Sequence, residues 1–225
     1  MLRDRGAPRL YDAARGLKNK KRCTRVCVEW QLRAVEGDVD MVMVNDAILS
    51  AATELGIIDE VQAYLENGVE DGRDATERLL YCFNTIENEL ALDYFPLKTE
   101  VEVETEMGVV HFSGLDKKVV RILKVEDEWG NDVPFKIFPE YVKTQIGGKV
   151  KMTYAYIPKK KELGEQSDFT LYASARLFAY GMAAQYTLQN GSFEENAIWE
   201  KKYKDAIKRT YRLYEGKVIR SRRWV

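Results

Sequence analysis

Alternating apolar and polar side chains between residues 97 and 158 limit most strongly how this chain can fold. The alternation runs through several short stretches, among them KTEVEVETE, VVRILKVED and KVKMTYAYI. Turn-forming residues separate these stretches, namely Trp129-Gly130-Asn131-Asp132 and Gly147-Gly148, and Pro158 follows the last of them. A period of two places alternate side chains on opposite faces of a strand. We therefore expect a small antiparallel sheet or sandwich with one dry face.

Helical periodicity flanks this block on both sides. Before it, apolar residues recur three and four positions apart over residues 44–65, with Gly56 as an interruption, and again over residues 74–93. After it, the same spacing predicts helices over residues 168–189 and 193–215. The fold class expected is α+β: a bundle of about four helices with an inserted small antiparallel β-sheet domain and an extended C-terminal arm.

These patterns divide the chain into five parts. Residues 43–96 hold the N-terminal helices of the bundle, 97–158 the β insert, 159–216 the C-terminal helices and 217–225 the arm, while residues 1–42 form a basic leader without a sustained period. Two explanations of the leader remain open: a basic arm, or an upstream translated region in front of a natural start at Met41 or Met43. We expect it to be poorly ordered or non-native and place no function on it.

The arm has the composition of a docking segment. Its sequence is KVIRSRRWV, and the residues expected to bind a partner are Lys217, Ile219, Arg220, Arg222, Arg223, Trp224 and Val225. The cations can pair with carboxylates or phosphates, and the apolar side chains can serve as anchors. Arg and Trp contribute much of the energy of protein interfaces because both are planar and lose little freedom when ordered. The alternative is an ordinary frayed and solvated chain end.

Charge is strongly segregated in a chain whose net charge is only -1. Residues 1–40 carry ten Lys/Arg and six Asp/Glu, the arm carries four basic side chains, and residues 41–216 carry 21 basic and 30 acidic ones. An acidic body with two basic ends fits protein assembly better than sequence-independent binding of nucleic acid, which favours one concentrated basic face.

The sequence contains few motifs typical of catalysis, cofactor binding or metal binding. The chain has one histidine, His111, within a strand-like stretch, and three cysteines, of which Cys23 and Cys27 lack zinc-ligand spacing. It contains no P-loop, no GxGxxG motif and no nucleophile elbow, and its carboxylate pairs are expected by chance among 36 Asp and Glu. We therefore predict no enzyme activity, no cofactor and no metal site.

No apolar run is long enough to span a membrane and the start has no signal-peptide core, so a cytoplasmic protein is expected.

The order of these segments resembles the head-to-tail connectors of tailed bacteriophages and prophages. The resemblance rests on VNDAILSAATELG, the hairpin KVEDEWGNDVPFKIFP, the strand KVKMTYAYIPKKKEL, the helix LYASARLFAYGMAAQYTLQNG, the segment FEENAIWEKKYKDAIKR and the final SRRWV. More narrowly, the chain is similar to the adaptor, gatekeeper or tail tubular protein A-like proteins, which form a ring below the portal. It covers roughly residues 43–225 and contains no invariant chemical motif.

The resemblance implies a virion protein at the head-tail interface, assembled in the host cytoplasm. Its copies would form a closed ring, a dodecamer in that family, between the portal protein and a downstream tail or nozzle protein. DNA would pass through the channel without sequence-specific binding, and the arm, Lys217 to Val225, would anchor the ring to the portal. Acidic strand rows, in which Glu102, Glu104 and Glu106 share one face, would then line the channel or meet the next tail ring.

Two other classes of protein stay open from the sequence. The first is a cytoplasmic nucleic-acid-binding or regulatory protein that uses its two basic ends, for which a steep salt dependence of DNA affinity would be expected. The second is a tail component that cleaves peptidoglycan with a carboxylate pair, which would lose lytic activity when one carboxylate is replaced.

Overall fold

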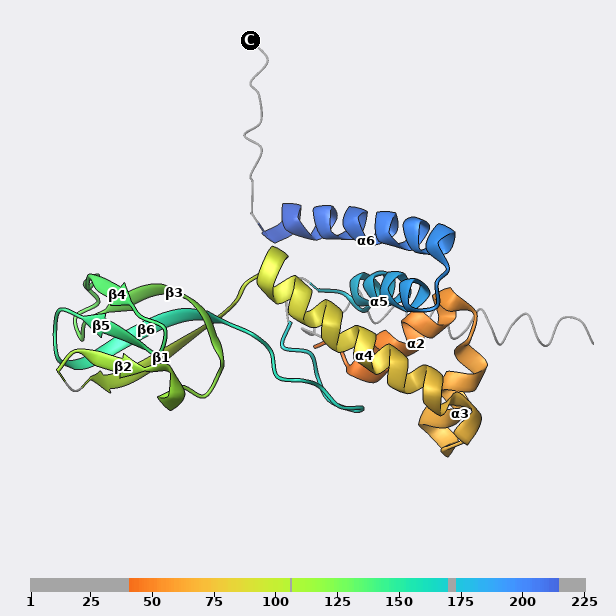
Figure 1. Cartoon of the computed structure of the whole chain (residues 1–225), viewed down its shortest axis with the longest axis horizontal. Helices are drawn as coiled ribbons and strands as arrows, with labels where there is room; N and C mark the ends of the chain where they lie inside the picture. Colours follow the sequence, from red (N-terminus) through yellow and green to blue (C-terminus); the bar gives the residue numbers. More distant parts are fainter. Residues whose placement is uncertain (1–40, 106, 170–172, 215–225) are drawn as a thin grey trace, which may run out of the picture. The chain divides into compact units, whose positions relative to one another are not determined.

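The computed structural model describes residues 41–105, 107–169 and 173–214. In these residues, five α-helices and six strands form a mixed α+β fold with two small antiparallel sheets (Figure 1), which confirms the predicted class. The described body begins at Met41, and Val42 already has a buried side chain. The basic residues 1–40 lie outside the described part of the chain.

Glycine divides the first predicted helical segment into two helices, α2 (Val44–Leu55) and α3 (Ile58–Asn67). Gly56 and Gly68 follow them with φ angles of 76° and 68°. This left-handed conformation is readily accessible to glycine and lets the backbone N–H of the capping residue bond to the last carbonyls of the helix. The interruption predicted at Gly56 is thus a true helix end.

The next helix is longer and ends in an irregular turn. After a short 3-10 turn, Glu70–Gly72, helix α4 (Arg73–Glu89) continues into one π-helical turn, Leu90–Tyr94. Pro96 lies two residues beyond that turn, which agrees with the predicted stop because proline cannot continue a helical hydrogen-bond ladder.

The third predicted helix starts later than expected. We predict its start near Asp168, but helix α5 spans Ala175–Gln189 and begins where the Ser174 hydroxyl accepts a hydrogen bond from the backbone N–H of Leu177 at 3.2 Å. Residues 161–169 instead form a non-helical loop with a turn at Leu163 and Gly164, because their polar groups bond to α4 and to residues 42–45. Helix α6 spans Phe193–Tyr214, close to the predicted bounds.

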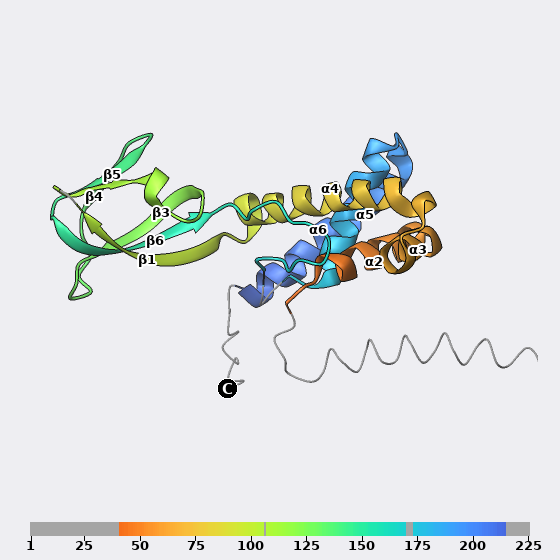
Figure 2. The same cartoon turned by 90° about the horizontal axis from the view of Figure 1, so that it is seen from below.

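One hydrophobic cluster unites the helices. Helix α5 lies between α6 on one side and α2 and α4 on the other (Figures 1 and 2). Phe83 of α4 stacks on Phe178 of α5 with ring centroids 4.8 Å apart, and Tyr203 and Ile207 of α6 are buried in the same cluster. The five residues that the spacing over 74–93 predicts on one face are all buried there, namely Leu79, Cys82, Phe83, Ile86 and Leu90.

The β insert has a hydrophobic cluster of its own. Its strands are β1 (Leu97–Thr105), β2 (Val109–His111), β3 (Val119–Glu126), β4 (Phe135–Ile137), β5 (Tyr141–Thr144) and β6 (Gly148–Tyr156). They pair in the orders β1-β6-β3 and β2-β5-β4. Buried side chains from both sheets, including Val142, Met152 and Tyr154, form one cluster. Two three-stranded sheets around one core match the sandwich alternative of the prediction.

The strand register brings the two ends of the insert together. Leu97 at the start of β1 pairs with Tyr156 at the end of β6, and the ladder continues to Thr105 opposite Gly148. The chain therefore enters and leaves the insert at neighbouring positions.

Candidate functional site

The residues predicted to bind a partner lie outside the described part of the chain. They are Lys217, Ile219, Arg220, Arg222, Arg223, Trp224 and Val225. The structure describes the helix that leads to them, α6, up to Tyr214. Tyr203, Ile207 and Thr210 of α6 are buried.

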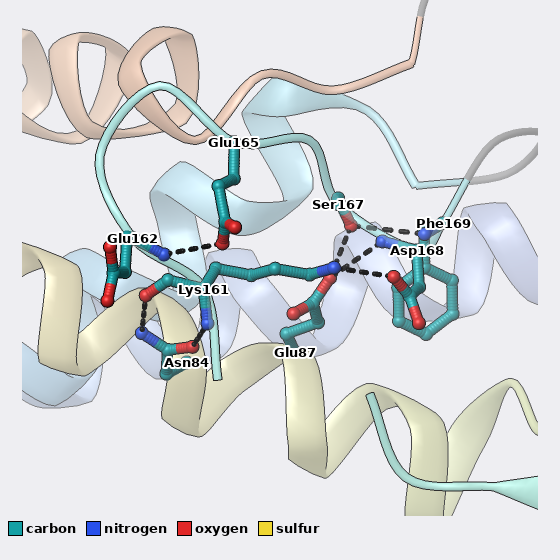
Figure 3. Close-up of polar contacts among 8 residues, drawn as sticks. All are labelled: Asn84, Glu87, Lys161, Glu162, Glu165, Ser167, Asp168 and Phe169. Atoms are coloured by element: carbon teal, nitrogen blue, oxygen red, sulfur yellow. Dashed lines mark hydrogen bonds and ion pairs between the residues drawn. The ribbon is translucent and has the colours of Figure 1, made fainter. Parts of the chain in front are cut away.

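Close to the helical core, a polar network fastens the non-helical residues 157–169 to α4. We call these residues the strap (Figure 3). The Asn84 side chain bonds to the backbone of Lys161 in both directions: its Oδ1 accepts from the Lys161 N–H at 2.6 Å, and its Nδ2 donates to the Lys161 carbonyl at 3.1 Å. A side-chain amide that mimics a strand partner in this way fixes the register of the strap on the helix.

One turn further along α4, Glu87 holds the other end of the strap. Its Oε1 accepts hydrogen bonds from the Ser167 hydroxyl at 2.6 Å and from the Asp168 backbone N–H at 3.0 Å. The side chain is only 1 % exposed. Burial raises the pKa of Glu87, and the two hydrogen bonds and the Lys161 charge offset only part of that rise.

Lys161 completes the network through its ion pair with Asp168, at 2.5 Å between Nζ and Oδ1. Burial acts to lower the pKa of Lys161, but the hydrogen bond to Asp168 and the nearby carboxylates outweigh it, and the pKa is raised. The strap also bonds to the chain before and within α2: the Val42 carbonyl accepts from Ser167 and the Asn45 side chain accepts from Gly164. The polar groups of the network are paired with one another, so it acts as a clamp between α2, the strap and α4.

A second group of titratable residues surrounds the end of α4. Burial, and next the charge of Asp93 one turn away, raise the pKa of Glu89. The buried Tyr203 hydroxyl lies beside this carboxylate, and its pKa is also raised, first by burial and then by the charge of Glu89. On the same side of α6, Lys204 is bonded to Glu200 at 2.6 Å. The residue after the π-helical turn meets α6 further along, where the rings of Phe95 and Tyr211 are 6.4 Å apart.

The predicted acidic strand row is partly neutralised. Glu102 and Glu104 point outward on β1 but pair in register with Lys151 and Lys149 of β6, and Lys151 forms an ion pair with Glu100 at 2.5 Å. Cross-strand pairs of opposite charge stabilise a sheet modestly. Glu106, the third member of the predicted row, lies outside the described residues.

The cysteine and the histidine in the described part of the chain, Cys82 and His111, are not arranged for catalysis with other reactive side chains. Cys82 is a buried free thiol, and burial raises its pKa to about 12, which leaves it unreactive at neutral pH. His111 is exposed on β2, with its ring 5.7 Å from that of Tyr141. Within residues 41–214, apart from the short gaps, no group of three or more His, Cys, Asp or Glu side chains is arranged to hold a metal ion. No described helix combines the length and the apolar character that a membrane crossing requires.

A shallow groove lies at the other end of α4. Its lining comprises Asp74, Glu77, Arg78, Tyr81 and Gln189, and Arg78 donates a hydrogen bond to the Asn190 side chain at 3.0 Å. Next to it in the chain, Leu188 and Phe193 are 45 % and 70 % exposed. Large apolar side chains that stay in solvent around a groove are typical of protein contact surfaces.

Comparison with known proteins leaves the function to be argued from the structure, because no protein-family model and no curated protein matches this chain.

The sequence analysis did not predict the clamp. A signal for it was present, since Glu87 occupies the apolar stripe of α4 four residues after Phe83. A carboxylate in such a position needs bonded partners when it is buried.

Proposed function

We propose that this protein is a structural subunit of the ring that joins the portal to the tail in a tailed bacteriophage or prophage. Its copies would stack side by side around a channel for DNA, with the portal protein above and a tail or nozzle protein below. In this proposal α2 to α6 form the ring-building bundle, and the arm, Lys217 to Val225, anchors each copy to the portal. The protein would have no catalytic role.

The layout of the chain is the observation that carries this proposal. The β insert leaves the helical part and returns beside its point of departure, since Leu97 pairs with Tyr156, while helices before and after it share one hydrophobic cluster. Helix α6 then runs directly into a segment with four basic side chains and a tryptophan. This is the succession of elements on which the resemblance to connector proteins rests.

Exposed apolar side chains support an assembled state. Tyr81 on α4 and Ile198 on α6 are both 59 % exposed, and Phe193 is 70 % exposed. A closed ring of identical subunits requires two different complementary faces on each copy, and uncovered side chains on α4 and α6 can supply them. The paired charges of β1 and β6 suit a surface that DNA passes without being held.

Deletion of residues 217–225 tests the anchoring role. The shortened chain is expected to stay folded and monomeric but to lose co-sedimentation with portal rings, because the arm supplies the cationic and tryptophan contacts. Full-stoichiometry binding by the shortened chain would overturn the assignment. The matched control is Lys159→Ala with Lys160→Ala, which removes two exposed lysines of the strap and should leave portal binding unchanged.

The same samples distinguish the nucleic-acid alternative. If the basic ends bind DNA, the full chain will show an affinity that falls steeply with salt, and a chain limited to residues 41–216 will lose it. For a connector we expect weak binding with little difference between the two chains. The neighbouring reading frames provide an independent check, because portal, capsid and tail genes should lie beside this one.

A further inference from the structure

The turn between β3 and β4 holds a tryptophan that packing leaves in solvent. Trp129 is 82 % exposed. The Asp127 carboxylate fixes the turn, because it accepts hydrogen bonds from the backbone N–H groups of Trp129 at 2.9 Å and Asn131 at 2.8 Å, and from the Asn131 side chain at 3.0 Å. A large exposed aromatic side chain on a rigid turn is suited to anchor a protein interface, since little conformational freedom is lost on binding.

The same turn is strongly acidic. Residues 126–132, which we call the tryptophan turn, carry four carboxylates and no basic side chain. Lys124 of β3 pairs with two of them, Glu126 at 2.6 Å and Asp132 at 3.2 Å. Glu128 is exposed and has no ion pair with a described residue. An open hollow of about 410 Å³ beside the turn is lined by four carboxylates and two lysines, so it favours a cationic side chain from a partner.

A surface of opposite charge lies on α6. Residues 198–209 carry five basic and two acidic side chains. Lys201, Lys204 and Lys208 are three and four positions apart, so they share one face of the helix, and all three are exposed. Ile198, three residues before Lys201, is 59 % exposed. We call these four residues the α6 face.

Two lysines of the α6 face have weak partners within their own helix. Lys204 bonds to Glu200 at 2.6 Å and Lys208 to Asp205 at 3.4 Å, while all four side chains stay largely exposed. Exposed pairs of this kind contribute little free energy. The ammonium groups therefore remain able to bind carboxylates of another molecule.

We propose that the tryptophan turn of one copy docks on the α6 face of a second copy. Trp129 covers Ile198, and the carboxylates of the turn bind the lysines of the face. This inference rests on the proposed function and deepens it, because it names two surfaces that join neighbouring subunits. Charge complementarity selects a second copy as the occupant: four carboxylates meet a segment with a net charge of +3. Such a contact joins two different surfaces, so it can repeat from copy to copy and close a ring.

Carbodiimide cross-linking tests this contact in the full-length protein. The reagent joins a carboxylate and a nearby lysine amine through an amide bond, and it traps contacts too weak to give a stable oligomer without the portal. Heavy-isotope-labelled and unlabelled copies are mixed at high protein concentration and low salt, so a linked peptide pair that carries one label identifies a bond between copies. We expect links from Glu128 to the lysines of the α6 face, with a yield that falls at high salt.

Replacement of the apolar anchor separates docking from random collision. Trp129→Ala keeps every reactive group but should lower the yield of these links about tenfold, because an aromatic anchor supplies much of the binding energy of an interface. Ile198→Ala should lower it as well. The control is Ile137→Ala, which shortens a side chain that is 57 % exposed on β4 and should leave the yield unchanged. Unchanged links in folded Trp129→Ala, or no link between copies in the wild type, would overturn the proposal.

The remaining outcomes distinguish other occupants and the proposed function. Links confined to single copies would place the turn on its own chain and overturn the second-copy assignment. In particles assembled with portal and tail proteins, links from Glu128 to one of those proteins instead of α6 would overturn it too. Portal binding without links between copies leaves the proposed function standing and the docking contact wrong. Links between copies that never join a portal leave the contact standing and the proposed function wrong.

Discussion

At the scale of single residues, the clamp shows that a buried carboxylate, that of Glu87, can be tolerated where it fixes the strap on α4. Glu87 and Asn84 lie on the side of α4 that meets the strap, and between them they bind the backbone of Lys161 and Asp168. Sequence patterns predicted the apolar members of this helix, such as Phe83, because burial follows periodicity. They could not predict the partners of Glu87, which lie 80 residues away in the chain.

The replacement Glu87→Gln tests the role of this charge. Glutamine keeps an acceptor for Ser167 and Asp168, so the free energy of unfolding at neutral pH should change by less than about 1 kcal/mol, whereas Glu87→Ala should cost about 2 kcal/mol through unpaired buried donors. Thermal unfolding followed by circular dichroism gives both values. Equal stability of the alanine and glutamine variants would contradict the clamp.

The pH dependence of stability follows from the same residue. The pKa of Glu87 is raised on folding, so the folded state holds the proton more tightly than the unfolded chain does. The free energy of unfolding should therefore decrease as the pH rises from the ordinary glutamate pKa through the raised one. In Glu87→Gln this decrease should become shallower, and the remainder reflects Glu89, whose pKa is also raised. Identical pH profiles for wild type and variant would contradict the burial of an ionisable group here.

At the scale of secondary-structure elements, the boundaries that local chemistry determines were predictable. Gly56 and Gly68 end α2 and α3, and Pro96 follows the last turn of α4. The start of α5 was predicted wrongly because Asp168 begins a pattern with helical spacing, while its backbone N–H is already bonded to Glu87. A contact distant in sequence thus overrode the local preference.

Contact between α3 and α4 depends on a small residue. A Cβ atom at Gly72 would lie 2.0 Å from the backbone carbonyl oxygen of Glu60, and no rotamer change relieves a clash with backbone. Gly72→Ala should therefore lower the free energy of unfolding by about 2 kcal/mol. Gly114→Ala is the control, because a Cβ atom there meets nothing within 4 Å. Urea unfolding of both variants measures the difference, and equal midpoints would show that the α3–α4 contact can shift freely.

At the scale of the whole molecule, composition and periodicity predicted the α+β class and the insertion of strands between helices. They could not predict how the strands divide into two sheets, because β2 and β4 have three residues each and pair with β5 through contacts that periodicity does not encode. The arm, which is the predicted partner site, lies outside the described residues, so its role stays a prediction.

Assembly of the ring should depend on exposed apolar side chains that are not part of the hydrophobic core. Phe193→Ser with Ile198→Ser removes two exposed side chains of α6, so the melting temperature should change by no more than about 2 °C. Ring formation on portal particles, counted by electron microscopy, should be lost. Ile137→Ser is the control, since Ile137 is 57 % exposed on β4. Normal rings from the α6 double variant would place the subunit contact elsewhere.

The adjacency of Leu97 and Tyr156 makes the strand segment a module. Because its two ends pair with each other, a short turn could replace it without stretching the helices that precede and follow it. Evolution could exchange or lengthen such a module while the helical framework stays the same, and related chains would then differ most between these two positions.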